Sequence, residues 1–277
     1  MTLQNNNNIE NIINKRMSVQ LSLYGFSFLV TNSTNKETLF FSETEFEHPI
    51  SPEELLLNLQ TTISKQSILH SNFTEVLIVY ATNLYNIVPT TLFDKTKASD
   101  YLKFNSKILA NDFVAFDVID DFDINVVYIP FININNYLFD CYGNFSYFHA
   151  STILLKQLLN KKNNFSLPKI YINVSKNFFD FIAIKNSKLI LCNTYEYKTS
   201  EDFIYYILFC LEQLNFNPDT VEVILLGTIT EEDLNYTILY NYIRNISFYN
   251  FEEVNINTSN KSLSAHNQML LKLLQCE

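Results

Sequence analysis

The densest group of side chains able to do chemistry is a set of carboxylates, Asp117, Asp120, Asp121 and Asp123. If the strand were continuous, alternation would place Asp117, Asp121 and Asp123 on one face. Carboxylates gathered in this way are ligands for Mg²⁺ or Ca²⁺. Asp is also a common turn residue, because its side chain bonds the backbone locally. We therefore favour a solvated hairpin turn over a metal site.

A second pair of reactive residue types, His149 and Ser151, stands close together in the chain. A histidine base beside a serine suggests a nucleophile, but the sequence has no G-x-S-x-G motif to present that serine on a sharp turn. We expect instead that His149 ends a strand and that Ser151 caps the following helix.

Composition narrows the class of ligand. The chain of 277 residues has only 3 glycines, and glycine is what lets a backbone approach a phosphate closely, so Gly-rich nucleotide motifs are disfavoured. The net charge is −10, whereas a nucleic-acid binder needs a basic surface. The adjacent basic pairs are Lys15-Arg16 and Lys161-Lys162 alone. We expect no nucleic-acid partner.

The cysteines and the N-terminal residues indicate the cellular compartment in which the protein is expected. Cys141, Cys192, Cys210 and Cys276 are far apart and form no C-x-x-C, so a zinc knuckle is not indicated. Residues 1–16 are Asn-rich and are expected to be a flexible leader rather than a secretory signal. No apolar run approaches the ~20 residues of a membrane-spanning helix. These features favour a cytoplasmic protein with no membrane span.

Hydrophobic patterning predicts a series of strands and helices in the first part of the chain. Ser51 is a natural N-cap, with Pro52 at the first helical position. The apolar run at 75–80 suits a strand buried on both faces. The remaining expected elements are strands over 19–23, 26–32 and 37–46, a helix over 90–104, a hairpin over 113–119 and 124–129, a short helix over 134–141, a strand over 145–149 and a helix over 151–162.

The second part of the chain repeats this order. Strands are expected over 169–174, 178–184 and 188–197, a helix from Thr199, a strand over 221–226, a helix over 230–244, a strand over 246–250 and a helix over 263–274. Ser27–Val30 matches Asp180–Ala183, and Glu75–Val79 matches Glu222–Leu226. We therefore predict an α/β fold of two βββαβαβα units, at 17–165 and 166–277, with an insertion at about 112–141.

A duplicated βββαβαβα unit, which is ribonuclease H-like, resembles the actin-like ATPase fold of actin, sugar kinases and heat-shock chaperones. More narrowly, Leu21–Phe28 is similar to an uncharacterised bacterial family described as a domain of unknown function with that fold. Members of that family usually have Asp where this chain has Tyr24. The resemblance covers most of the chain and implies mixed five-stranded sheets with a cleft between the halves.

The resemblance also implies where a nucleotide site would lie. Its first phosphate turn corresponds to Tyr24, Gly25 and Ser27, where one glycine and no carboxylate remain. The second corresponds to Ser175–Phe178, which has no glycine, and the adenosine site corresponds to Gly227 and Thr228. Asp180 matches Ser27 and is the carboxylate nearest the expected cleft; it is either catalytic or structural.

These losses remove most of the groups that would stabilise phosphates. The sequence therefore favours a cytosolic, non-catalytic actin-like protein that needs no cofactor and acts as a protein-interaction or regulatory module. The alternative is a divergent ATP-binding phosphotransferase or ATPase that uses ATP with Mg²⁺. A third option is self-association into a homo-oligomer.

Overall fold

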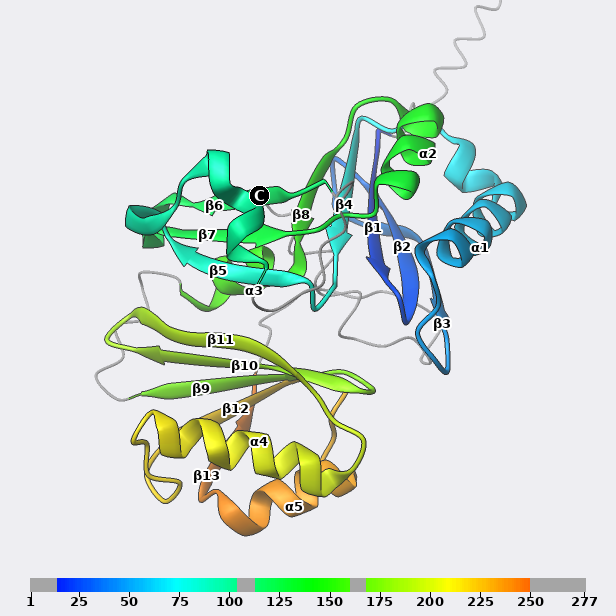
Figure 1. Ribbon diagram of the computed structural model, residues 1–277. Coiled ribbons are helices and arrows are strands. Elements are labelled where there is room, and N and C mark those ends of the chain that lie inside the picture. The colour runs from blue at the N-terminus through cyan, green and yellow to red at the C-terminus, as the bar shows by residue number, and fades with distance from the viewer. Residues whose placement is uncertain (1–13, 104–112, 160–167, 250–277) are drawn as a thin grey trace, which may run out of the picture.

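The computed structural model describes residues 14–103, 113–159 and 168–249. Two five-stranded sheets occupy separate halves of the molecule (Figure 1). The first has the order β3-β2-β1-β4-β8 and the second the order β11-β10-β9-β12-β13. The strands of the first are β1 (Lys15–Ser22), β2 (Gly25–Asn32), β3 (Thr38–Glu45), β4 (Glu75–Tyr80) and β8 (Ser146–His149). The strands of the second are β9 (Lys169–Val174), β10 (Phe178–Lys185), β11 (Lys188–Glu196), β12 (Glu222–Gly227) and β13 (Asn245–Phe248).

The two sheets have the same strand directions as well as the same order. In each, the first three strands are antiparallel, and the fourth and fifth pair in parallel beside the first. The mixed, duplicated α/β fold expected from the sequence is thus confirmed.

The helices follow the same repeat. Helix α1 (Pro52–Lys65) corresponds to α4 (Ser200–Gln213), since each joins the third strand of its sheet to the fourth. Helix α2 (Ile132–Tyr142) corresponds to α5 (Leu234–Tyr242), since each joins the fourth strand to the fifth. Helix α2, which the sequence analysis assigns to the insertion expected at about 112–141, thus takes the same place in the first half as α5 takes in the second. Helix α3 (Ala150–Leu158) follows β8. The helix expected over 263–274 lies outside the described residues.

Matched caps explain why the chain turns into a helix at the same point of each unit. Ser51 and Glu54 form a capping box at α1, in which each side chain bonds the other's backbone N–H. Thr199 and Asp202 do the same at α4. Because these side chains satisfy backbone donors that the first helical turn leaves free, both helices begin where the sequence predicts.

A third, three-stranded sheet has no counterpart among the described residues of the second half. It has the order β5-β7-β6, with β5 at Tyr85–Pro89, β6 at Ala115–Ile119 and β7 at Ile124–Tyr128. The expected hairpin is confirmed, but the sequence did not indicate β5. The α-helix expected over 90–104 is wrong in type, because the described part of that range forms 3₁₀ turns at Thr90–Leu92 and Lys95–Tyr101.

The halves share buried side chains. One cluster joins Leu154, Leu155 and Leu158 of α3 to residues of the second sheet that include Ile182 and Ile224. Helices α4 and α5 cover the opposite face of that sheet (Figure 1). The boundary expected at 165/166 falls outside the described residues and stays a prediction. Within the described residues, no helix combines the length and apolarity needed to span a bilayer.

Candidate functional site

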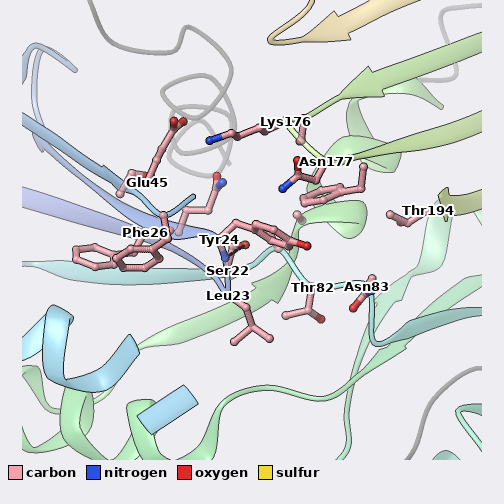
Figure 2. A pocket seen from close by; sticks show the side chains of 18 of the residues that line it. Ser22, Leu23, Tyr24, Phe26, Glu45, Thr82, Asn83, Lys176, Asn177 and Thr194 are labelled. Carbon is pink, nitrogen blue, oxygen red and sulfur yellow. Dashed lines mark hydrogen bonds between the residues drawn. The ribbon is translucent and has the colours of Figure 1, made fainter. Parts of the chain in front are cut away.

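The turns of the two repeated hairpins meet at the centre of the molecule. Tyr24 stands in the turn between β1 and β2, and Phe178 begins β10 just after the corresponding turn of the second half. Their ring centroids are 5.7 Å apart at an interplanar angle of 51°. Figure 2 shows Tyr24 between the strands of the two halves, near Asn177 and Thr82. In the fold that the sequence resembles, these turns would be the two phosphate loops.

A cavity of about 390 Å³ lies beside this contact and is lined by both halves. The expected site residues Tyr24, Gly25, Ser27, Asp180 and Thr228 line it. Gly227 is adjacent to Thr228 but is not among the lining residues. Folding thus brings five of the six candidate residues to one cavity.

Two polar rows, one from each hairpin, line this cavity. In the first half, Gln20 pairs with Ser27 and Ser27 pairs with Glu43 across β1, β2 and β3. Paired residues on neighbouring strands share a face of the sheet, so a row of three forms. The second half repeats the row with Asn173, Asp180 and Thr194 across β9, β10 and β11. We call these six residues the cleft rows.

Asp180 is the centre of the second row. Its Oδ2 accepts a hydrogen bond from Asn173 Nδ2 at 2.9 Å, and its Oδ1 accepts one from Thr194 Oγ1 at 2.6 Å. The hydroxyl of Tyr85, from β5, lies 3.0 Å from Thr194 Oγ1. Because Thr194 gives its proton to the carboxylate, Tyr85 is the donor in that contact. Burial raises the pKa of the Asp180 carboxyl, and the two hydrogen bonds act in the opposite direction.

His149 stands at the edge of the cavity as a neutral ring. Its Nδ1 accepts from the backbone N–H of Ser151 at 3.1 Å, so the ring proton is on Nε2, 3.0 Å from the carbonyl oxygen of Thr82. Burial lowers the pKa of His149 to about 4. His149 itself caps α3, so the assignment of Ser151 as the cap was wrong. The Nδ1 atom of His149 accepts the hydrogen bond from the backbone N–H of Ser151. The imidazole ring, and not the Ser151 hydroxyl, is therefore the cap of α3.

The lining of the cavity is acidic. It includes four carboxylates, from Glu43, Glu45, Asp180 and Glu196, but a single lysine, Lys176. Glu45 and Glu196 occupy equivalent places, since Glu45 pairs with Gly25 and Glu196 with Phe178. Glu196 also acts on the Tyr24 hydroxyl: burial is the main cause that raises the pKa of Tyr24, and the negative charge of Glu196 adds to it.

Two glycines near the cavity are required by backbone packing. A Cβ added to Gly25 would lie 2.3 Å from the carbonyl oxygen of Thr44. A Cβ added to Gly227 would lie 2.0 Å from the carbonyl oxygen of Val174, and Gly227 has φ = +90°. Both positions sit where neighbouring strands approach, so both glycines have a structural role regardless of any ligand.

The four carboxylates of the hairpin do not come together as one group in the structure. Asp117 is buried and accepts hydrogen bonds from Tyr128 Oη at 3.0 Å, His149 N at 2.8 Å and Thr152 Oγ1 at 2.6 Å. Asp120, Asp121 and Asp123 are exposed in the turn, as expected. The described residues contain no group of three His, Cys, Asp or Glu side chains able to hold a metal ion. Asp117 instead ties β6, β7 and α3 together.

Sequence reasoning missed six residues of the site. They are Gln20, Glu43, Glu45, Asn173, Thr194 and Glu196, which all line the cavity. A signal for them was present in the repeat, because the first three strands of one unit can be matched to those of the other. Tyr85 had no such signal, since β5 lies in the third sheet, which has no counterpart in the described part of the second half.

The fold and the cleft define the class of protein. A solved structure from Bacteroides thetaiotaomicron, described as a protein with actin-like ATPase fold and unknown function, superposes with a TM-score of 0.81 and covers 98% of both chains at 22% identity. The chain has the actin-like ATPase fold.

A family match then places the chain more narrowly. Residues 4–246 match the family described as "Protein of unknown function (DUF3822)", and the chain belongs to that family. The sequence resemblance is thereby confirmed. No protein with a curated description matches the chain.

More distant similarities are structural only. A chain of the PilM-PilN type IV pilus biogenesis complex has a TM-score of 0.52 and 8% identity, and the match covers 85% of this chain and 88% of that one. The ethanolamine utilization protein EutJ from Carboxydothermus hydrogenoformans has a TM-score of 0.48 and 8% identity, with 96% and 92% covered.

Proposed function

We propose that this protein is a non-catalytic, cytosolic member of the actin-like fold and that it works by binding another protein. The observation that carries the proposal is the contact between Tyr24 and Phe178, with ring centroids 5.7 Å apart. Phosphate loops need free backbone N–H groups at this point. Here the two turns instead bring two aromatic side chains into contact with each other.

Charge supports the same conclusion. A nucleoside triphosphate would meet Glu43, Glu45, Asp180 and Glu196 in the cavity, with Lys176 as the one opposing charge among the lining residues. Like charges in a partly buried site repel strongly because little water screens them. The neutral state of His149 adds no positive charge.

A binding role has a precedent within the fold. The PilM-PilN structure is a complex between two proteins, and one of its chains is similar in fold to this one. The precedent concerns the mode of action only.

The first experiment asks whether the cleft takes ATP. The melting temperature of the purified full chain is measured with rising ATP and excess Mg²⁺. A site saturated at one hundred times its Kd would add about 2.7 kcal/mol of stability. That gain corresponds to a rise of roughly 5–10 °C. We expect no saturable rise, and a clear one would refute the non-catalytic assignment.

The second experiment asks for the partner. The tagged full chain is used to capture proteins from the native cytosol, and each captured protein is then purified and titrated against it alone. We expect one direct, saturable complex. Sedimentation at rising concentration tests the alternative that the partner is a second copy of this chain. If no captured protein binds directly and the chain remains a monomer, the proposal is wrong.

A further inference from the structure

The lining of the cleft cavity contains buried polar atoms that lack hydrogen-bond partners. Ser27 and Asn173 are only 1% and 5% exposed, and both line the cavity. Ser27 Oγ and Asn173 Oδ1 are buried atoms without a hydrogen-bond partner in the structure. A buried polar atom left unpaired costs about 1–3 kcal/mol, so native proteins rarely leave two beside one cavity. These two atoms come from equivalent rows of the two halves.

Asp180 adds a carboxyl group to these buried polar atoms, and a cation bound beside it would favour its charged form against the burial that raises its pKa. Its carboxylate has one hydrogen bond on each oxygen and retains lone pairs for more. Within the described part of the chain, no ion pair involves Asp180. Among these residues Asp180 therefore has no cationic partner of its own, although Lys176 lines the same cavity.

A group that paired with Asp180 and with the unpaired atoms would donate several hydrogen bonds and carry a positive charge. An ammonium has three N–H donors and a guanidinium has five. A bare metal ion fits less well, because the described residues contain no group of three His, Cys, Asp or Glu side chains able to hold one. The aromatic walls at Phe26, Phe131 and Phe178 suit an alkyl chain or the face of a guanidinium. At about 390 Å³ the cavity is large enough for such a group and its alkyl stem.

We propose that the cleft cavity binds an alkylammonium or alkylguanidinium group, with Asp180 as its counter-ion and with Asn173 Oδ1 and Ser27 Oγ as further acceptors. The group comes from a free small cation or from a lysine or arginine side chain of the protein partner. This proposal rests on the proposed function in one respect, that the cleft is not a nucleotide site.

The test is a calorimetric titration of the full chain with four probes. They are agmatine, putrescine, a short glycine-flanked arginine peptide, and the same peptide with citrulline, which keeps the shape but has no charge. We expect saturable binding of at least one cation and none of the citrulline peptide. Binding of agmatine or putrescine identifies a small-molecule site, whereas binding of the arginine peptide alone identifies a partner side chain. If no cation binds at millimolar concentration, or if citrulline binds equally well, the proposal is wrong.

Three variants locate the binding. Asp180→Asn should weaken cation binding by about 10- to 100-fold, since it removes a charge-assisted contact. The variant can fold, because a flipped Asn173 amide would present Oδ1 to the new amide nitrogen. Ser27→Ala leaves no new unpaired atom and should weaken binding a few-fold. Glu45→Gln, which removes an exposed carboxylate at the same cavity, is the matched control and should change binding by less than Ser27→Ala. Equal binding by wild type and Asp180→Asn would overturn the assignment.

This test is independent of the ATP and partner experiments. If a protein partner is found but no cation binds, the proposed function stands and the cation site fails. If ATP binds saturably, the proposed function fails, and the cation titration with Asp180→Asn still decides the site.

Discussion

Replacing Gly227 by alanine tests whether this glycine serves backbone packing or is left over from an adenosine site. A Cβ at position 227 would lie 2.0 Å from the carbonyl oxygen and 2.7 Å from the nitrogen of Val174. Ordinary contact distances are longer than both, so the end of β12 must move away from β9. That movement breaks the hydrogen bond from Thr228 N to Val174 O, which is 2.9 Å long.

The cost can be worked out from two terms. A left-handed backbone at φ = +90° costs an alanine about 1–2 kcal/mol. Loss of one backbone hydrogen bond costs about 0.5–1.5 kcal/mol. Together they predict a loss of about 1.5–3.5 kcal/mol, which corresponds to a fall of roughly 3–14 °C in melting temperature.

Gly143→Ala is the matched control. Gly143 also has a positive φ, of +74°, but a Cβ there would meet no atom within 4 Å. The control should therefore show only a backbone cost, of about 1–3 kcal/mol at φ = +74° and ψ = −140°. Both variants are measured by thermal and urea unfolding without any ligand. If Gly227→Ala loses no more stability than Gly143→Ala, the packing argument is refuted.

Three further predictions concern the cleft and the helix caps. Tyr24→Asp should fold and still show no rise in melting temperature with ATP and Mg²⁺, because the acidic lining remains; tight ATP binding would contradict the view of a degenerate cleft. His149 should make stability fall as the pH drops, because its folded pKa, about 4, lies below the unfolded value near 6.5. The stability that the neutral ring contributes is present above pH 6.5 and is lost toward pH 4, up to about 3 kcal/mol. The measurement is the pH dependence of the free energy of unfolding in urea, for wild type and for His149→Asn, which keeps a capping acceptor but does not titrate. The comparison separates the contribution of His149 from the opposite contributions of Asp117 and Asp180, whose pKa values are raised by burial. The same pH dependence in both proteins would show that the ring does not titrate as described. Thr199→Ala should cost about 1 kcal/mol by removing the α4 cap, seen in thermal unfolding, and an unchanged melting temperature would mean that the capping box adds no stability.

The repeated architecture could be predicted from local sequence. The strands at Glu75–Tyr80 and Lys169–Val174 have the predicted bounds, because continuous apolar runs specify strands buried on both faces. The starts of α1 and α4 were predictable because Ser51 and Thr199 bond the helix backbone within three residues. In each case the physical cause lies within a few neighbouring positions.

Other features depend on residues far apart in the chain. Strand β5 has Asn86 and Pro89 within five residues and is a strand because it pairs with β7. Asp117 looks like one more solvated turn carboxylate, but Tyr128, His149 and Thr152 bury it with three hydrogen bonds. No local pattern encodes these partners.

The sequence by itself determined the duplicated fold and the loss of glycine and carboxylate from the first turn. It did not determine what fills the cleft. Tyr24 meets Phe178 only because two copies of the same hairpin face each other in the folded molecule. The same folding brings the cleft rows, Gln20-Ser27-Glu43 and Asn173-Asp180-Thr194, to one cavity. The acidity of that cavity is thus a property of the tertiary structure, because its charges come from strands that only the closed fold brings together.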